Sequence, residues 1–137
     1  MKLIFNQSLI HQNSFCSIKV SSTKQSIYNS LSIEDTQLGL YINAFVVDNL
    51  QCLIIDTSLV KKLNLQFYLD DNDNPITIEL EDDLGNSIDS SKAYELNIHF
   101  QINNTEIIKK AICIEMDIKK SYDVDMLYGK GTVLKEY

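Results

Sequence analysis

The chain has 137 residues, of which 45% are hydrophobic, and a formal net charge of −7 at pH 7. This length and hydrophobic fraction are typical of a single globular domain and exclude an intrinsically disordered chain. All twelve basic side chains are lysines, and they are outnumbered by acidic residues. Direct DNA binding is disfavoured, because it requires concentrated positive charge.

No apolar run approaches the ~20 residues of a membrane span. The opening residues, MKLIFNQSLI, have too short an apolar stretch for a secretory signal. We therefore expect a cytoplasmic protein with no membrane contact. The spacing of the three cysteines, Cys16, Cys52 and Cys113, fits neither a disulfide framework nor a zinc site, so the sequence predicts buried free thiols. Both histidines, His11 and His99, are isolated, and we expect no metal or cofactor.

The first 39 residues contain three expected elements. KLIF (2–5) and FCSIKV (15–20) have the composition of short strands, and in the second apolar and polar residues alternate. SSTKQSIYNSL (21–31) predicts a short helix with Ser22 or Thr23 as its cap. The polar stretch SIEDTQLG (32–39) marks a boundary between an N-terminal extension (1–39) and the main β unit (40–137).

Five stronger strand patterns follow, separated by turn-forming stretches such as DDNDNP and DDLGNS. An apparent helix, LVKKL, starts directly after the second of these strands, and GKGTVLKEY (129–137) predicts a glycine turn leading into a short helix. The five strands are LGLYINAFVV (38–47), QCLIID (51–56), ITIEL (76–80), AYELNIHFQI (93–102) and IIKKAICIEM (107–116). The chain is therefore predicted to be mostly β: a small antiparallel closed barrel or folded sheet with one short C-terminal helix and a short N-terminal β/α extension.

Four of these stretches occur in an order typical of one family. They are LYINAFVVDNLQCLIIDTS (40–58), ITIELEDDLGNSIDSSKAYELNIHF (76–100), IIKKAICIEM (107–116) and YDVDMLYGKGTVLKEY (122–137). In this order the chain resembles the retropepsin-like aspartic proteases of retroelements and of ubiquitin-linked proteins. The stretches are similar to that family's hairpin ending in the active-site turn, its flap hairpin, its later core strand and its terminal segment.

The resemblance makes Asp56 the counterpart of the catalytic aspartate, with Thr57 supporting its turn. In that chemistry two carboxylates share one proton, one activating a water and the other protonating the substrate carbonyl. Each chain of the family supplies one aspartate, so activity requires a homodimer. Ser58 and the flap residues Leu84, Gly85 and Asn86 are then expected to border the binding groove, with Gly85 in the tight flap turn.

Three departures from the family pattern argue against catalysis. Ser58 stands where the family has glycine, so a side chain occupies space beside the active-site turn. Several residues that orient the carboxylate are missing between DTS and LVKKL, and a small misplacement of a catalytic group is costly. No stretch before Tyr137 matches the terminal strand that interleaves two retroviral protomers, so a homodimer is weakly supported.

Two acidic clusters have alternative interpretations. Residues 70–81 (DDNDNPITIELE) place oxygen ligands at EF-hand spacing, but Pro75 stands where the sharp turn needs glycine and a strand follows. A solvated loop fits better. Glu79 and Glu81 share one face of a strand, which predicts a solvated sheet edge and not a carboxylate pair for catalysis. Ser58 as a nucleophile is disfavoured, because no histidine lies near it in the sequence.

These patterns support two functional hypotheses. The preferred one is a pseudoenzyme: a non-catalytic protein of the retropepsin fold that binds another protein or a larger assembly, using its former substrate groove or its sheet edges. The alternative is a homodimeric aspartic endopeptidase that uses Asp56 from each chain.

Overall fold

The computed structural model describes residues 2–5, 10–23, 39–48 and 50–135. The elements are β1 (Lys2–Ile4), β2 (Ile10–Ser21), β3 (Leu40–Val47), β4 (Leu53–Asp56), α3 (Thr57–Leu63), β5 (Thr77–Glu81), β6 (Ser87–Ile102), β7 (Thr105–Met116), α4 (Lys119–Tyr122) and β8 (Met126–Gly129). Among the described residues, no helix is long and apolar enough to cross a membrane.

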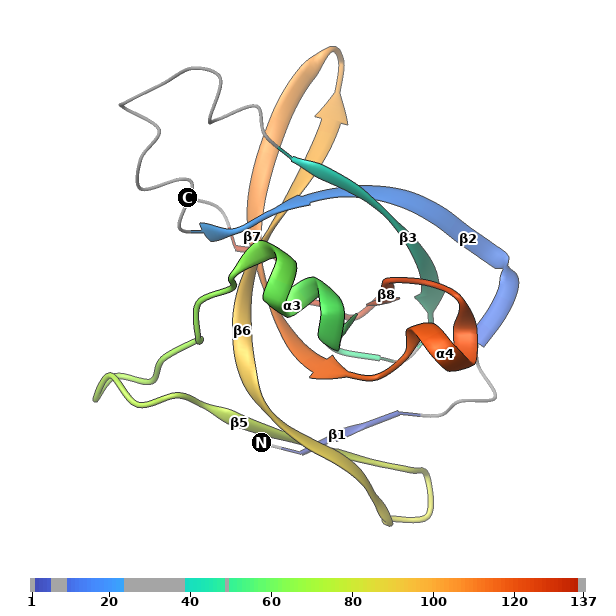
Figure 1. Cartoon of the computed structure of the whole chain (residues 1–137), viewed down its shortest axis with the longest axis vertical. Coiled ribbons are helices and arrows are strands. Elements are labelled where there is room, and N and C mark those ends of the chain that lie inside the picture. The colour runs from blue at the N-terminus through green and yellow to red at the C-terminus, as the bar shows by residue number, and fades with distance from the viewer. Residues whose placement is uncertain (1, 6–9, 24–38, 49, 136–137) are drawn as a thin grey trace.

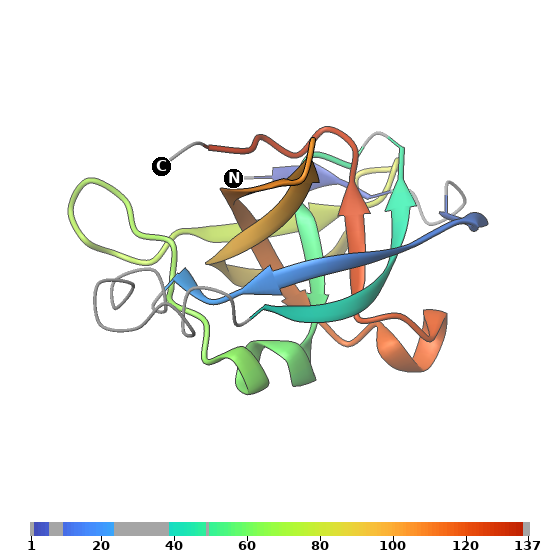
Figure 2. The same cartoon turned by 90° about the horizontal axis from the view of Figure 1, so that it is seen from above.

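Six strands form a closed barrel, and the predicted fold class is confirmed. Around the barrel the order is β6, β2, β3, β8, β4 and β7, and the β6–β7 pairing closes the ring. Two of these pairings, β3–β8 and β4–β7, are parallel, whereas the sequence predicted an antiparallel arrangement. The first of these arises because β8, the last of the described strands, inserts between β3 and β4 (Figures 1 and 2).

The N-terminal residues belong to the same sheet as the rest of the chain. β2 pairs with both β3 and β6 and is therefore one of the six barrel strands. β1 pairs in parallel with β5 and covers its outer edge. The helix predicted within 21–31 lies largely outside the described residues, and the proposed boundary at residue 39 stays a prediction.

β4 lies between two hydrophobic clusters. Leu53 and Ile55 contribute to one cluster, and Ile54 contributes to the other with the preceding Cys52. Successive side chains of a strand point to opposite faces, so a strand that is buried on both faces must be apolar throughout. This explains why LII is uninterrupted and why its first polar residue, Asp56, comes where the strand ends.

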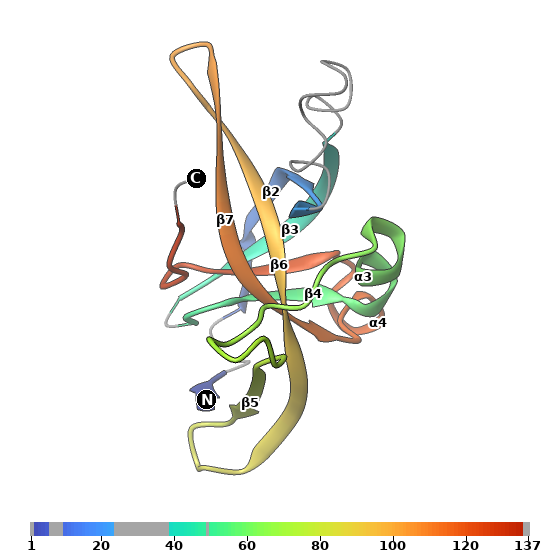
Figure 3. The same cartoon turned by 90° about the vertical axis from the view of Figure 1, so that its left-hand side faces the viewer.

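The two described helices lie at the same end of the barrel, and the chain termini lie on the opposite side (Figures 2 and 3). The prediction of a helix after Gly129 is wrong for residues 132–135. There the chain is extended, and Lys135 exchanges two backbone hydrogen bonds of 2.8 Å with Lys110 of β7. The short C-terminal helix is instead α4, which precedes β8.

The three cysteines are free thiols. Cys52 and Cys113 are buried, as predicted, whereas Cys16 on β2 packs at the margin of the core and is only partly buried, because it lines an open pocket. Burial raises the pKa of Cys52 to about 12 and raises that of Cys113 as well. Both thiols therefore stay protonated and pack as small apolar groups.

Candidate functional site

Asp56 occupies the junction between β4 and α3. Its backbone is extended and its side chain caps the first turn of the helix, so the helix begins at Thr57 without an intervening loop. Its own amide donates to the carbonyl of Asp125 over 2.9 Å. The side chain is only 4% exposed, because it points back between the starts of α3 and α4.

Four hydrogen bonds from the chain itself reach the Asp56 carboxylate. Oδ2 accepts from the amide of Ser58 at 3.1 Å and from the Ser58 hydroxyl. Oδ1 accepts from the amides of Ile118 at 3.1 Å and Lys119 at 2.9 Å. Burial by itself raises the pKa of Asp56, but these hydrogen bonds outweigh it, so the pKa lies below its ordinary value. The carboxylate is thus ionised and tied to two helix starts.

An open groove runs beside this junction, with a volume of about 380 Å³. Thr57 is the one predicted site residue that lines it. The remaining walls come from β6 and the end of β7, and from the segment that follows α3 (Phe67; Asp89, Ser90, Ser91, Lys92 and Tyr94; Glu115, Met116 and Asp117).

Aromatic rings form one wall of this groove. Phe67 stacks on Tyr94 with ring centroids 5.1 Å apart, and the ammonium of Lys92 lies 5.3 Å from the Phe67 ring. The Tyr94 hydroxyl donates to Glu115 at 3.2 Å. Burial, followed by the nearby Glu115 carboxylate, raises the pKa of Tyr94, so the phenol stays neutral. A stacked pair with polar tips is a surface suited to protein contacts.

A stretch of β6 at the groove has no paired strand on one side in the described chain, although the Lys92 carbonyl accepts from the Ser91 hydroxyl at 2.8 Å and that hydroxyl accepts from the Glu115 amide at 3.2 Å. On one side β6 pairs with β5 through residues 87–92, and on the other side β7 pairs with β6 only from Ala93 onward. Within the described chain, no strand pairs with residues 87–92 on that second side. The Ala93 amide bonds to Ile76 on the β5 side over 2.7 Å. Since the direction of the amides alternates, those of Ser90 and Lys92 face the groove.

The predicted flap residues lie elsewhere. Leu84, Gly85 and Asn86 form the β5–β6 turn, and none of the three lines the groove. Oδ1 of Asp82 accepts from the amides of Leu84 at 3.0 Å and Asn86 at 2.8 Å, and Gly85 has φ +84°. The Leu84 side chain is 81% exposed. Ser58 is exposed, but its hydroxyl is directed at Asp56.

The acidic loop at residues 70–74, which we expected to be solvated, is stabilised by the side chain of Asp70. Oδ1 of Asp70 accepts from the amides of Asn72 and Asn74, both at 2.9 Å. Across the described residues, no three His, Cys, Asp or Glu side chains gather as a metal site. On β5, Glu79 and Glu81 share the partly exposed face, whereas Ile78 and Leu80 are buried.

Sequence reasoning missed a buried polar cluster on the other side of the barrel. Nε2 of His99 lies 2.7 Å from the Ser21 hydroxyl, and Nδ1 lies 3.1 Å from Glu106, which also bonds to Lys19 at 2.9 Å. Ser21 and His99 are 78 positions apart and meet through the β2–β6 pairing. The one available signal was a histidine within the apolar strand pattern NIHF. Ser21 is 4% exposed, whereas Lys19, His99 and Glu106 line an open pocket of about 480 Å³, so the cluster connects a buried hydroxyl to the wall of that pocket.

No protein-family model, no curated protein and no solved structure matches the chain.

Proposed function

We propose that this protein is a non-catalytic relative of the retropepsin-like proteases and that its groove binds an extended segment of a partner protein. The proposal combines the family resemblance of the sequence with the geometry around Asp56. The observation that carries it is the set of four hydrogen bonds that occupies the Asp56 carboxylate from within the chain.

An aspartate that activates water needs a lone pair directed at that water. In Asp56 both oxygens already accept two hydrogen bonds, and only 4% of the residue is exposed. The adjoining helix start leaves no turn that could present the carboxylate to a second chain. These features support the pseudoenzyme over the homodimeric endopeptidase. No observation in the described residues supports the endopeptidase.

The binding mode is inferred from the groove's walls. A segment laid along β6 would meet the amides of Ser90 and Lys92 and extend the sheet by one strand, while its side chains would pack on Phe67 and Tyr94. Main-chain hydrogen bonds supply affinity in such strand addition, and the side-chain pockets supply selectivity. The groove is lined by the carboxylates of Asp89, Glu115 and Asp117 and by the ammonium of Lys92, so a partner segment with a net positive charge suits it.

The test is a selection of random peptides displayed on phage against the wild-type protein. Peptides that bind the groove should lose binding at least about tenfold to Ser90→Pro, which removes one groove-facing amide. They should keep it with the matched control Ser90→Ala, which retains that amide. Failure to select any peptide, or equal binding to both variants, would refute the proposed mode.

Catalysis is tested separately. Wild type and Asp56→Asn are incubated with an unfolded protein substrate at mildly acidic pH, where a shared-proton pair is active. We expect no cleavage by either. Cleavage by wild type that disappears in Asp56→Asn would establish the endopeptidase instead.

A further inference from the structure

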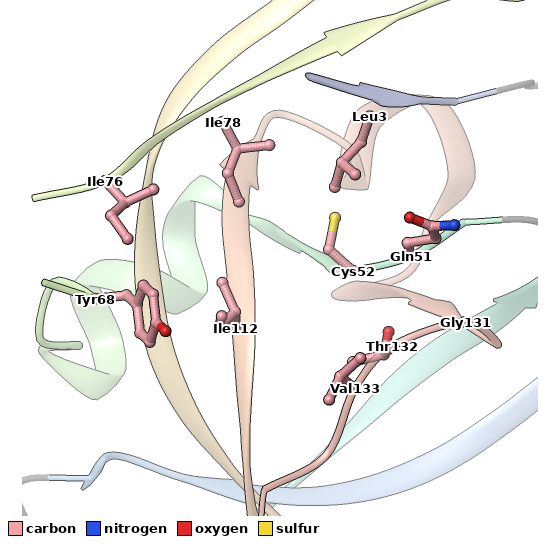
Figure 4. Close-up of a pocket in the computed structure, with 10 residues that line it drawn as sticks. All are labelled: Leu3, Gln51, Cys52, Tyr68, Ile76, Ile78, Ile112, Gly131, Thr132 and Val133. Atoms are coloured by element: carbon pink, nitrogen blue, oxygen red, sulfur yellow. The ribbon is translucent and has the colours of Figure 1, made fainter. Parts of the chain in front are cut away.

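A second cavity, of about 410 Å³, lies between β1, β5 and the chain that follows β8 (Figure 4). It shares no lining residue with the groove at Thr57, so a ligand in this cavity is independent of the proposed function. Its walls are contributed by β1, β5 and β7, by the segments before β4 and β5, and by the chain after β8 (Leu3, Gln51, Cys52, Tyr68, Ile76, Ile78, Ile112, Gly131, Thr132 and Val133).

Most of this lining is aliphatic. Ile76, Ile78 and Ile112 line one part of the cavity, and the Cys52 side chain points toward Leu3 across from them (Figure 4). The raised pKa of Cys52 keeps its thiol uncharged at neutral pH. The Thr132 hydroxyl already donates to the carbonyl of Gly129, so it does not need a ligand. A cavity with such walls favours an apolar molecule over water.

A cation borders one end of the cavity. Lys135 does not line the cavity itself, but its ammonium lies 3.1 Å from the hydroxyl and 5.2 Å from the ring centroid of Tyr68, which does. The backbone of Lys135 is fixed by its two hydrogen bonds to Lys110 on β7. Among the described residues Lys135 forms no ion pair. An ammonium and a phenol at the end of an apolar cavity match a carboxylate on an aliphatic chain.

We propose that this cavity binds an aliphatic carboxylate of medium chain length, with the hydrocarbon between the three isoleucines and Leu3 and the carboxylate on Lys135 and Tyr68. The apolar walls supply most of the affinity. The charged end supplies the preference for a carboxylate over an alcohol of the same length.

The experiment is a titration of the full chain with decanoate and, separately, with decanol, both below their aggregation limits. Binding is monitored through the methyl NMR signals of the protein. We expect saturable binding that shifts the methyl signals of Ile76, Ile78 and Ile112. The signals of Leu59, the buried residue of α3, should not move. Decanoate should bind about tenfold more tightly than decanol, as for a hydrogen bond to a charged group.

Variants then test each end of the cavity. Lys135→Met should reduce decanoate binding to the level of decanol and leave decanol binding unchanged, whereas the control Lys62→Met, on α3, should alter neither. Val133→Trp places a large side chain at the mouth from a residue that is 71% exposed, so the fold is retained while binding of both ligands falls. Ile112→Phe fills the interior as a second obstruction.

Three results would overturn the proposal. They are the absence of saturable decanoate binding to wild type, methyl shifts confined to residues outside the cavity, and an unchanged preference for decanoate in Lys135→Met. Because the first two are measured on the unaltered protein, a variant that fails to fold does not obscure the outcome.

Discussion

The backbone amide of Lys119 donates a 2.9 Å hydrogen bond to Oδ1 of Asp56, 63 positions earlier in the chain. The other oxygen of the same carboxylate caps α3 through Ser58. One side chain therefore satisfies unpaired amides at the starts of two helices, which lie at one end of the barrel (Figure 2). The Asp56 carboxylate thus fixes the position of these two helices. Both the stability of the protein and its response to acid should depend on this carboxylate.

Replacing Asp56 with alanine should destabilise the protein by about 3 kcal/mol, because it removes a helix cap and leaves several amides without an acceptor. Ser58→Ala, which removes only the hydroxyl donor, should cost about 1 kcal/mol. Urea denaturation followed by circular dichroism measures both. Losses below about 0.5 kcal/mol for Asp56→Ala would contradict the capping role.

The stability of the protein should also fall in acid through Asp56. Its pKa is lowered in the folded state, so the unfolded chain binds its proton more readily. The stabilisation is fully present above the ordinary carboxyl pKa of about 4 and is lost as the pH falls through the lower folded value. Unfolding free energies measured between pH 7 and pH 2 should fall less steeply for Asp56→Asn than for wild type. Parallel profiles for the two proteins would show that Asp56 has no such role.

Two glycines should differ in their tolerance of a methyl group. A Cβ at Gly129 would collide with the backbone carbonyls of Leu50 and Cys52, whereas one at Gly85 would meet nothing but must adopt φ +84°. Gly129→Ala should therefore cost about 3 kcal/mol, and Gly85→Ala about 1 kcal/mol. Thermal unfolding of the two variants gives the order directly. A larger loss at Gly85 would show that backbone conformation outweighs the collision at Gly129.

The buried cluster around His99 should be sensitive to loss of the imidazole. His99→Phe leaves the Ser21 hydroxyl buried without its partner, and we expect a loss of about 2 kcal/mol. Glu106→Gln should cost less than about 1 kcal/mol, because the Glu106 side chain is 31% exposed and its ion pairs are screened. The two variants are compared by urea denaturation. Equal losses of unfolding free energy would show that the ion pairs of Glu106 contribute as much to stability as the buried Ser21–His99 contact.

Patterns within single strands were the most predictable part of this fold. The uninterrupted LII of β4 and the alternating ITIEL of β5 correspond to strands buried on both faces and on one face, respectively. The helix after Asp56 is also predictable from its sequence, although it begins at Thr57, two residues before LVKKL, with Asp56 as its cap. These features depend on neighbouring residues alone.

Features that depend on distant pairing were not predictable in this way. The sequence after Gly129 favours a helix, but pairing with Lys110 holds Lys135 extended, so tertiary contacts override local preference. The Ser21–His99 contact requires the β2–β6 register, which no local pattern specifies. The amides of Ile118 and Lys119 at Asp56 likewise depend on how the end of β7 passes α3.

The position of β8 has a consequence for synthesis of the chain. β3 and β4 leave the ribosome long before Met126, the first residue of the strand that lies between them. Until residues 126–129 emerge, the ring is open and both strands expose edges that invite pairing with other chains. The barrel therefore forms only after residues 126–129 have been synthesised, and a product truncated before Met126 would be a substrate for chaperones and proteases.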